Sequence, residues 1–228
     1  MNFTSDNPSL RQEICRIGAS LFARGYVHAS AGNISVRLDH GFLITPTDAC
    51  LGFLDPDALA FVDLQGVQLS GQRASKTLAL HQAIYGAAMG LSPSTRCVIH
   101  THSTHVVALS LADAALPTAS GPELLPPLTP YFVMKVGHVP LIDYHRPGDP
   151  AVAQVVAATI ARYAEQGLPL RAVMLSRLGP NVWHDTPAQA MATLEELEET
   201  ARLQLLRPAD GLRDDQIEEL RHTFGAHW

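Results

Sequence analysis

The sequence is poor in features that mark secreted, redox-active or nucleic-acid-binding proteins. Its three cysteines, Cys15, Cys50 and Cys97, show neither metal-binding nor redox spacing, and an odd number without a disulfide framework suits a reducing compartment. Charged residues make up only 17% of the chain, the formal net charge is -6, and lysine and arginine form no cluster. This charge balance argues against nucleic acid as a partner.

Long apolar runs are missing as well. No segment approaches the roughly 20 apolar residues that a membrane-spanning helix needs, and residues 1–6 lack the basic and apolar regions of a signal peptide. We therefore expect a cytoplasmic protein without membrane contact. At 228 residues, of which 46% are hydrophobic, the chain can bury a substantial core.

Hydrophobic periodicity predicts hairpins mixed with helices. Hairpins are expected at residues 34–45 and 61–69, and further strands at residues 97–100, 131–136, 139–144, 171–176 and 181–184. Helices are expected at residues 8–25, 76–89, 103–111, 149–167, 186–206 and 212–221. No repeat or linker divides the chain, so we expect one α/β domain, residues 1–228, with a largely antiparallel central sheet and helices on its faces.

Two segments stand out by composition. Residues 116–130 contain five prolines and predict a long surface loop, of the kind that is more often functional than idle. Residues 195–199 carry four glutamates, which we interpret as the solvated face of a long helix rather than as catalytic groups.

The strongest functional signal is the pair His100 and His102, which follows the apolar run of residues 97–99. Side chains two positions apart on a strand point to the same face, so both imidazoles can approach one metal ion. Functional sites also gather at strand ends in α/β sheets. The structural alternative is a pair of histidines that form hydrogen bonds at a strand end.

Several segments, in order along the chain, resemble the class II aldolase/adducin family. They are residues 31–37 (AGNISVR), 44–47 (ITPT), 75–81 (SKTLALH), the strand that ends at His100 and His102, and residues 178–180 (LGP). Residues 50–56, 128–131, 144–150 and 195–201 are more narrowly similar to the 3-oxo-tetronate 4-phosphate decarboxylases. The resemblance extends over nearly the whole chain.

The resemblance implies a three-layer α/β/α fold and a homotetramer with sites between subunits. It also implies a divalent metal, usually zinc, which holds oxygens of a small phosphorylated sugar-acid substrate and stabilises the enediolate left when a C–C bond breaks. The family's metal histidines correspond to His100 and His102. Its substrate-binding positions correspond to short polar residues that suit an anion, and to a neighbouring lysine: Asn33, Thr47, Ser75 and Lys76. A turn residue at position 33 and a helix cap at position 75 are the structural alternatives.

Tyr131 is the candidate catalytic residue that the resemblance implies. In relatives an aromatic residue at this position can reach a neighbouring subunit's site and donate a proton. We therefore expect Tyr131 and the proline-rich segment to lie at or near a subunit interface. Packing in the core or in an interface is the structural alternative.

Two positions depart from the family pattern. Relatives carry a glutamate, as metal ligand or acid/base, where this chain has Thr77, and a histidine where it has Leu178. Zinc sites normally use three or four protein ligands, so two histidines alone would hold zinc weakly, if at all. His105 could substitute as a ligand, unless it packs or forms hydrogen bonds at a helix start. Three more histidines could border the site: His28, His81 and His145.

Two functional hypotheses follow. The first is a carbon–carbon lyase that acts on a phosphorylated four-carbon sugar acid. Decarboxylation is favoured over retro-aldol cleavage, because loss of CO2 from a β-keto acid needs mainly an electrophile, whereas a retro-aldol step also needs a positioned base. The second is a non-catalytic family member that uses a degenerate metal site for binding or interaction. A different, metal-free chemistry on the remodelled site also stays open.

Overall fold

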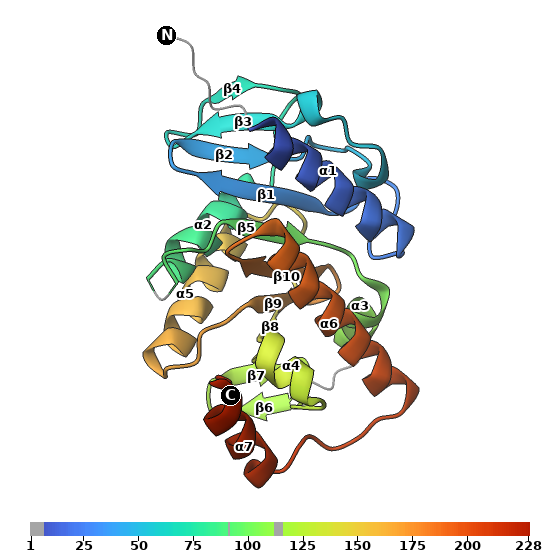
Figure 1. Ribbon diagram of the computed structural model, residues 1–228, viewed down its shortest axis with the longest axis vertical. Coiled ribbons are helices and arrows are strands. Elements are labelled where there is room, and N and C mark those ends of the chain that lie inside the picture. The colour runs from blue at the N-terminus through green and yellow to red at the C-terminus, as the bar shows by residue number, and fades with distance from the viewer. Residues whose placement is uncertain (1–6, 91, 112–115) are drawn as a thin grey trace.

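The computed structural model describes residues 7–90, 92–111 and 116–228 (Figure 1). Its centre is an eight-stranded sheet with the order β4-β3-β2-β1-β5-β10-β9-β8. The strands are β1 (Asn33–Leu38), β2 (Gly41–Ile44), β3 (Ala60–Asp63), β4 (Gln68–Ser70), β5 (Cys97–His100), β8 (Leu141–Ile142), β9 (Ala172–Leu175) and β10 (Gly179–His184). Neighbouring strands are antiparallel except for β8 and β9, which are parallel. The expected α/β fold with a largely antiparallel sheet is confirmed.

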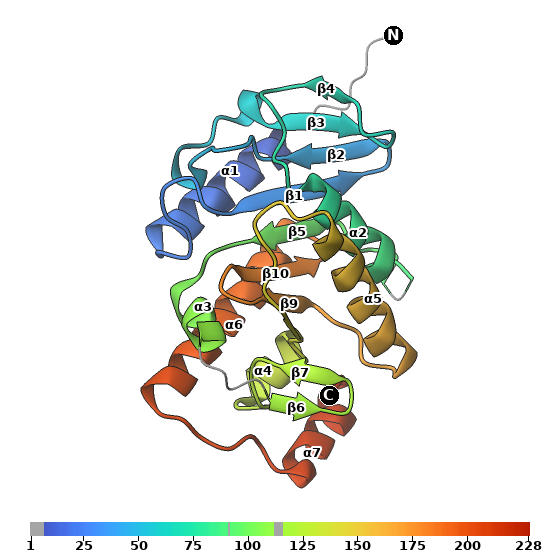
Figure 2. The same ribbon diagram turned by 180° about the vertical axis from the view of Figure 1, so that it is seen from behind.

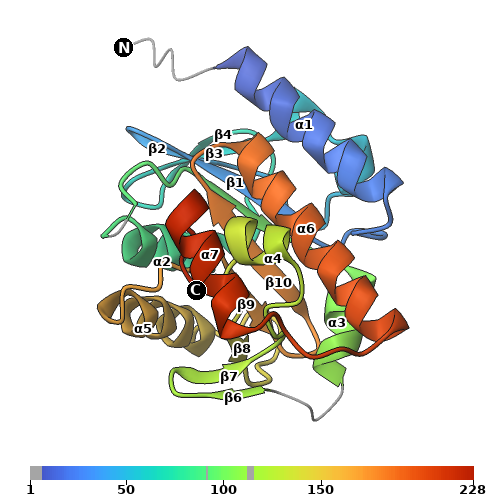
Figure 3. The ribbon, with the colours of Figure 1, turned by 60° about the horizontal axis from the view of Figure 1, so that its bottom comes forward.

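Helices cover both faces of the sheet and complete three layers (Figures 1, 2 and 3). One face carries α2 (Leu78–Ala88) and α5 (Ala151–Glu165). The other carries α1 (Pro8–Ala23), α3 (Thr104–Leu111), α4 (Pro130–Lys135) and α6 (Pro187–Leu206). The C-terminal α7 (Asp214–Phe224) packs against α4, and the short 3₁₀ helices η1 (Leu51–Phe53) and η2 (Pro56–Ala58) pack against α1. No helix in the described part of the chain is long and apolar enough to cross a membrane.

Strand alternation divides the core into two apolar clusters. On β5, Cys97 and Ile99 belong to the cluster under α1 and α6, whereas Val98 belongs to the cluster under α2 and α5. Each fully buried aliphatic side chain of this kind contributes about 1.5–3 kcal/mol. His100 comes two positions after Val98, so its side chain faces the layer of α2 and α5.

The predicted helix starts coincide with capping groups. The Thr186 hydroxyl accepts a hydrogen bond from the backbone N–H of Gln189 at 3.2 Å, and α6 begins at the following proline. The Asp149 carboxylate accepts one from the N–H of Ala151 at 3.0 Å, where α5 begins. Local side-chain chemistry therefore fixes where these helices begin.

Residues 131–136 form a helix, so the strand predicted there is wrong. The Thr129 hydroxyl accepts a hydrogen bond from the N–H of Phe132 at 3.1 Å, and Pro130 follows as the first residue of α4. The aromatic and β-branched residues suggested a strand, but they serve to bury Phe132 against α6 and α7. The capping pair overrides the propensity.

Other expectations at this end of the chain need smaller corrections. The proline-rich segment is less irregular than expected, because its first half forms the hairpin of β6 (Leu116–Thr118) and β7 (Gly121–Glu123). The strand expected at residues 139–144 shortens to the two residues of β8.

Glu198 is not part of a solvated face, as had been expected for residues 195–199. Its side chain is only 4% exposed. Its carboxylate accepts hydrogen bonds from the backbone N–H groups of His105 and Val106, at 3.0 and 3.1 Å, and lies 2.7 Å from Nδ1 of His105. Glu198 therefore holds the start of α3 against α6, while Glu199 next to it is exposed.

Candidate functional site

Three neighbouring strands place one polar residue each side by side at the centre of the sheet. Asn33 of β1 and Asn181 of β10 both lie directly opposite His100 of β5. Residues opposite one another in antiparallel strands project from the same face, so all three side chains point toward α2 and α5. All three residues are buried, Asn181 completely.

Several buried polar atoms around His100 lack a hydrogen-bond partner within the described residues. They are Oδ1 of Asn33, both side-chain polar atoms of Asn181, and Nε2 of His81. Leaving such a group unpaired costs about 1–3 kcal/mol, and native proteins bury few of them without a reason. Their concentration in one place indicates a site that receives a polar ligand.

Hydrogen bonds fix the orientation of two histidine rings here. Nδ1 of His100 donates to the carbonyl oxygen of Pro180 at 3.0 Å, which leaves the lone pair on Nε2. Burial, together with His102, lowers the pKa of His100 to about 3, so the ring is neutral at pH 7. On α2, Nδ1 of His81 lies 2.7 Å from the Ser35 hydroxyl, and burial, with His100 beside it, lowers the pKa of His81 to about 3.

His102 lies beyond the strand end but stays close to His100. The centroids of the two rings are 5.1 Å apart, and the centroid of the His28 ring lies 6.1 Å from that of His102. Burial lowers the pKa of His102, and His28 adds to this effect. The His102 ring therefore lies close to both the His100 ring and the His28 ring.

A cavity of about 180 Å³ opens next to His100, between the start of α2 and the start of α5. It is lined by Lys76 and Thr77, by Leu178, and by residues before α5 that include His145 and Arg146. Thr77 and Leu178 thus share one space with His100, as the family alignment predicts. His102 does not line this cavity and contacts the site through its neighbour's ring.

Two of the predicted substrate-binding residues lie on adjoining segments beside the cavity. The N–H of Thr47 donates to the carbonyl oxygen of Arg73 at 2.9 Å, and the N–H of Ser75 donates to that of Thr45 at 3.2 Å. The Ser75 and Thr77 hydroxyls form a hydrogen bond of 2.9 Å. This arrangement ties the segment before α2 to the end of β2 and orients Lys76 at the cavity rim.

Tyr131 and His105 lie apart from the cavity of their own chain. Tyr131 is on α4, across the sheet from α2 and α5, and is 64% exposed. Its expected contact with a neighbouring subunit's site stays a prediction. His105 is held by Glu198 at the start of α3, which is the structural alternative set out for it.

Comparisons with known proteins agree with this geometry. Residues 12–205 match the class II aldolase and adducin N-terminal domain. The chain belongs to the class II aldolase/adducin family. It is 53% identical to a 3-oxo-tetronate 4-phosphate decarboxylase from Cupriavidus necator, over 98% of this chain and 100% of the relative. It is 40% identical to the protein of that name from Escherichia coli, over 96% and 99%.

Solved structures show the same family fold. YgbL from Klebsiella pneumoniae superimposes with a TM-score of 0.82 at 40% identity, covering 93% of this chain and 98% of that one. The L-fuculose-1-phosphate aldolase from Thermus thermophilus superimposes with a TM-score of 0.70 at 26% identity, covering 86% and 93%. The three-layer architecture is therefore that of the class II aldolases.

The donor set of this family member does not match a complete zinc site. Nε2 of His100 has the free lone pair that a ligand needs, and His102 lies beside it. Thr77, however, pairs with Ser75, and Leu178 presents an apolar side chain to the cavity. Within residues 7–90, 92–111 and 116–228, no group of three or more His, Cys, Asp or Glu side chains could hold a metal ion. Protein zinc sites use three or four such ligands.

Two residues of the site escaped the sequence reasoning. Asn181 lies in a strand that was predicted, but only the register of β10 on β5 places it beside His100. Arg146 is in a segment that carried the family resemblance without a role for this residue, and the path of residues 145–150 brings it to the cavity rim. No local sequence pattern predicts either position, because both depend on contacts between segments that are distant in the sequence.

Proposed function

We propose that the protein is a carbon–carbon lyase that decarboxylates a phosphorylated four-carbon 3-oxo sugar acid, of the 3-oxo-tetronate 4-phosphate type. Relatives that are 40 to 53% identical over nearly their full length carry this name. The observation that carries the proposal is the cavity at His100, which is lined by the cations Lys76 and Arg146 together with one carboxylate, Asp149. The Asp149 carboxylate already accepts a hydrogen bond from the N–H of Ala151. A phosphorylated acid brings two anionic groups, and the cavity offers two cationic side chains to receive them.

The chemistry asks little of the protein beyond binding and charge stabilisation. When the carboxylate leaves as CO2, the electron pair of the broken C1–C2 bond forms a C2–C3 double bond, and negative charge moves to the oxygen on C3. Protonation at C2 then yields a phosphorylated three-carbon ketone. Hydrogen-bond donors and cations placed at the C3 oxygen lower the barrier, because the charge develops there.

The residues at the cavity can divide these tasks. Lys76 and Arg146 supply positive charge for the phosphate group and for the developing enediolate. The amide of Asn181 is a buried donor without a partner in the described residues; it lies opposite His100 in the sheet, behind the cavity lining. His100 is neutral and offers an acceptor nitrogen, so it fits a substrate hydroxyl rather than an oxyanion. Members of this family typically use a divalent metal, but the donor set here is incomplete and we assign no step to one.

We further propose that the protein works as a homotetramer, in which Tyr131 reaches the cavity of a neighbouring subunit. The exposure of this tyrosine on α4 supports the proposal. Light scattering at micromolar concentration should report four chains, and a monomer would contradict the assembly without touching the assignment of the cavity.

A second candidate function is a binding protein that keeps the substrate site but has lost catalysis. The observation that favours it is the pair Thr77 and Leu178, which occupy the cavity where the family pattern has coordinating groups. The two candidates share the ligand and differ only in turnover.

The test is release of CO2 from 3-oxo-tetronate 4-phosphate, with the product followed by 31P NMR. We expect turnover by the wild-type protein, and a drop in kcat/KM of roughly 100-fold for Lys76→Gln and for Arg146→Gln, as expected for lost charge-assisted contacts. Arg202→Gln is the matched control, because within the described residues Arg202 pairs with the exposed Glu199 on α6 and with no other acid. Saturable binding without CO2 release, with or without added zinc, would refute the lyase and establish the binding protein.

A further inference from the structure

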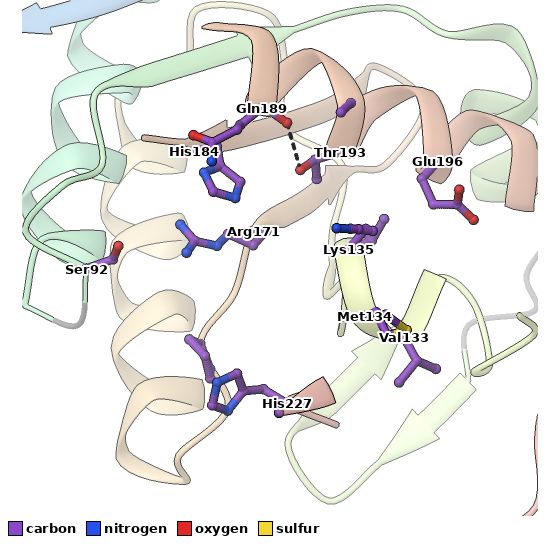
Figure 4. A pocket seen from close by; sticks show the side chains of 15 residues that line it. Ser92, Val133, Met134, Lys135, Arg171, His184, Gln189, Thr193, Glu196 and His227 are labelled. Carbon is purple, nitrogen blue, oxygen red and sulfur yellow. Dashed lines mark hydrogen bonds between the residues drawn. The ribbon is translucent and has the colours of Figure 1, made fainter. Parts of the chain in front are cut away.

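A second cavity, of about 580 Å³, lies at the opposite end of β9 and β10 from the candidate site (Figure 4). We call it the distal cavity. Arg171 precedes β9 and His184 ends β10, whereas Leu178, just before β10, lines the first cavity. The length of β10 separates the two cavities by about 17 Å at 3.3 Å per residue. The distal cavity is therefore not an extension of the site at His100.

The distal cavity carries an excess of positive groups. Its charged and titratable lining side chains are Lys135, Arg171, His184, Glu196 and His227. This bias runs against the composition, because the net charge is -6 and the chain has only two lysines. One of them, Lys135, lies at this cavity, and the other, Lys76, lies at the first cavity.

The cations of the distal cavity are only partly neutralised within the described residues, because the Asp185 carboxylate lies 3.7 Å from both Arg171 and Nδ1 of His184. Lys135 forms neither a hydrogen bond nor an ion pair there, and Figure 4 shows it pointing from α4 toward His184 and Arg171. The guanidinium of Arg171 reaches only Asp185, at 3.7 Å, which is too long for a hydrogen bond. The lining carboxylate of Glu196 accepts hydrogen bonds from the hydroxyls of Thr129 and Thr200, at 3.4 Å each.

His184 adds a directed donor. The backbone N–H of Asp185 donates to its Nδ1 at 2.8 Å, so the neutral ring carries its proton on Nε2. Burial lowers the pKa of Arg171. Burial, Arg171 and Lys135 lower the pKa of His184 against the opposite effect of Asp185. Arg171 and Lys135 thus disfavour the charged form of His184, and an anion placed between the three groups would offset this effect.

We propose that the distal cavity binds a small phosphorylated metabolite, with its phosphate group between Arg171, Lys135 and Nε2 of His184. Arginine offers paired donors that match phosphate oxygens, and lysine adds a mobile charge. The Ser92 hydroxyl on the facing wall is a further donor. A volume of about 580 Å³ exceeds what phosphate alone fills and lies within the range of ordinary ligand pockets.

The two lysines make the proposal directly testable by NMR on the full chain. Reductive methylation with 13C-formaldehyde labels both lysine ammonium groups and keeps their charge, so each cavity receives one probe, and the signal of the α-amino group stays unchanged in both lysine variants. Lys76→Arg and Lys135→Arg assign the two signals. Inorganic phosphate and 3-phosphoglycerate are then titrated separately, with sodium chloride at equal ionic strength as the blank.

We expect the Lys135 signal to shift saturably with both anions, and with a midpoint that differs from that of Lys76. Arg171→Gln should raise the anion concentration at which the Lys135 signal is half-shifted at least tenfold. The corresponding concentration for the Lys76 signal should stay unchanged. Glu196→Gln retains the hydrogen bonds but removes the lining carboxylate. It should therefore lower the anion concentration at half-shift of the Lys135 signal about threefold. Because Gln at position 196 has nearly the size of Glu, this variant keeps the test valid if Arg171→Gln does not fold, as judged by circular dichroism.

Three outcomes would overturn the proposal. The first is a Lys135 shift that follows sodium chloride linearly. The second is a saturable shift that neither variant changes. The third is a shift with heparin but with neither phosphate compound, which would assign the surface to a macromolecular polyanion. None of them bears on the lyase proposal, which is judged by CO2 release and by the Lys76 signal.

Discussion

Restoring the two missing coordinating groups should convert the cavity at His100 into a zinc site. The change is Thr77→Glu combined with Leu178→His. Both positions line the same cavity as His100, and His100 already presents Nε2 while Nδ1 is held by Pro180. A hydrogen bond from the ring nitrogen that does not face the metal orients a histidine for metal binding. The double variant would bring the ligand number from two to four.

The expected gain follows from the energetics of zinc binding. Structural zinc sites with four ligands bind with about 10–16 kcal/mol, or about 2.5–4 kcal/mol per ligand. Each restored ligand should therefore lower the dissociation constant by roughly 100-fold or more. We expect wild-type protein purified without added zinc to hold well under one metal per chain, the double variant to approach one, and each single variant to fall between them.

Elemental analysis after dialysis against a mild chelator measures the occupancy, and competition with a chromophoric chelator gives the dissociation constant. Thr77→Gln with Leu178→His is the matched control, because glutamine has the shape of glutamate without its charge. The reasoning fails if wild-type protein keeps a full equivalent of zinc through dialysis. A ligand other than those at positions 77 and 178 would then complete the shell, and the lyase would gain over the binding protein.

Three further predictions concern stability. Gly179→Ala should lower the free energy of unfolding by more than about 2 kcal/mol in urea titrations, because an added Cβ would lie 1.9 Å from the carbonyl oxygen of Thr101 at a φ of +149°; a loss under 0.5 kcal/mol would contradict this close approach. Glu198→Ala should cost about 1–3 kcal/mol in the same assay, since it leaves the start of α3 uncapped, and Glu199→Ala, at an exposed neighbour, should cost under 0.5. The pKa of His184 in the folded protein lies below its unfolded value of about 6.5, so the protein loses stability as the pH falls below that value and the unfolded ring takes up a proton. His184→Asn should therefore reduce the fall in melting temperature between pH 7 and pH 5. An unchanged fall would show that the folded protein does not hold this ring neutral.

The sheet and most helices were readable from the sequence because local signals determine them. The hairpin of β1 and β2, the buried strand before His100 and the capped start of α6 each depend on residues close together in the chain. The strand predicted at residues 131–136 was wrong because another local signal, the helix cap, was stronger than the strand propensity. There, two capping residues outweighed the propensity of the six that followed.

The polar arrangement inside the fold could not be read in this way. Asn181 meets His100 across 81 positions of sequence, through a register that no local pattern encodes. Glu198 meets His105 across 93 residues, and its burial contradicts the solvated face that its acidic neighbours suggest. Polar residues that act through distant partners look like surface residues when only their neighbours in sequence are considered.

The substitutions at positions 77 and 178 should affect binding and turnover differently, and this difference decides between the two candidate functions. In the proposed function, ligand binding depends on Lys76 and Arg146, which line the cavity. Turnover depends on stabilising charge at the C3 oxygen during CO2 loss, for which a metal-bound relative has a divalent cation in addition. Without metal, this chain would lack two positive charges of the metal and one negative charge of the glutamate relative to such a site, a net loss of one positive charge at the reacting centre. A change of this kind acts mainly on the transition state, so kcat should fall far more than the substrate affinity. If kcat and affinity fall together in Lys76→Gln while zinc leaves both unchanged in the wild-type protein, the rim cations alone perform the chemistry and the cavity is a metal-free decarboxylase site.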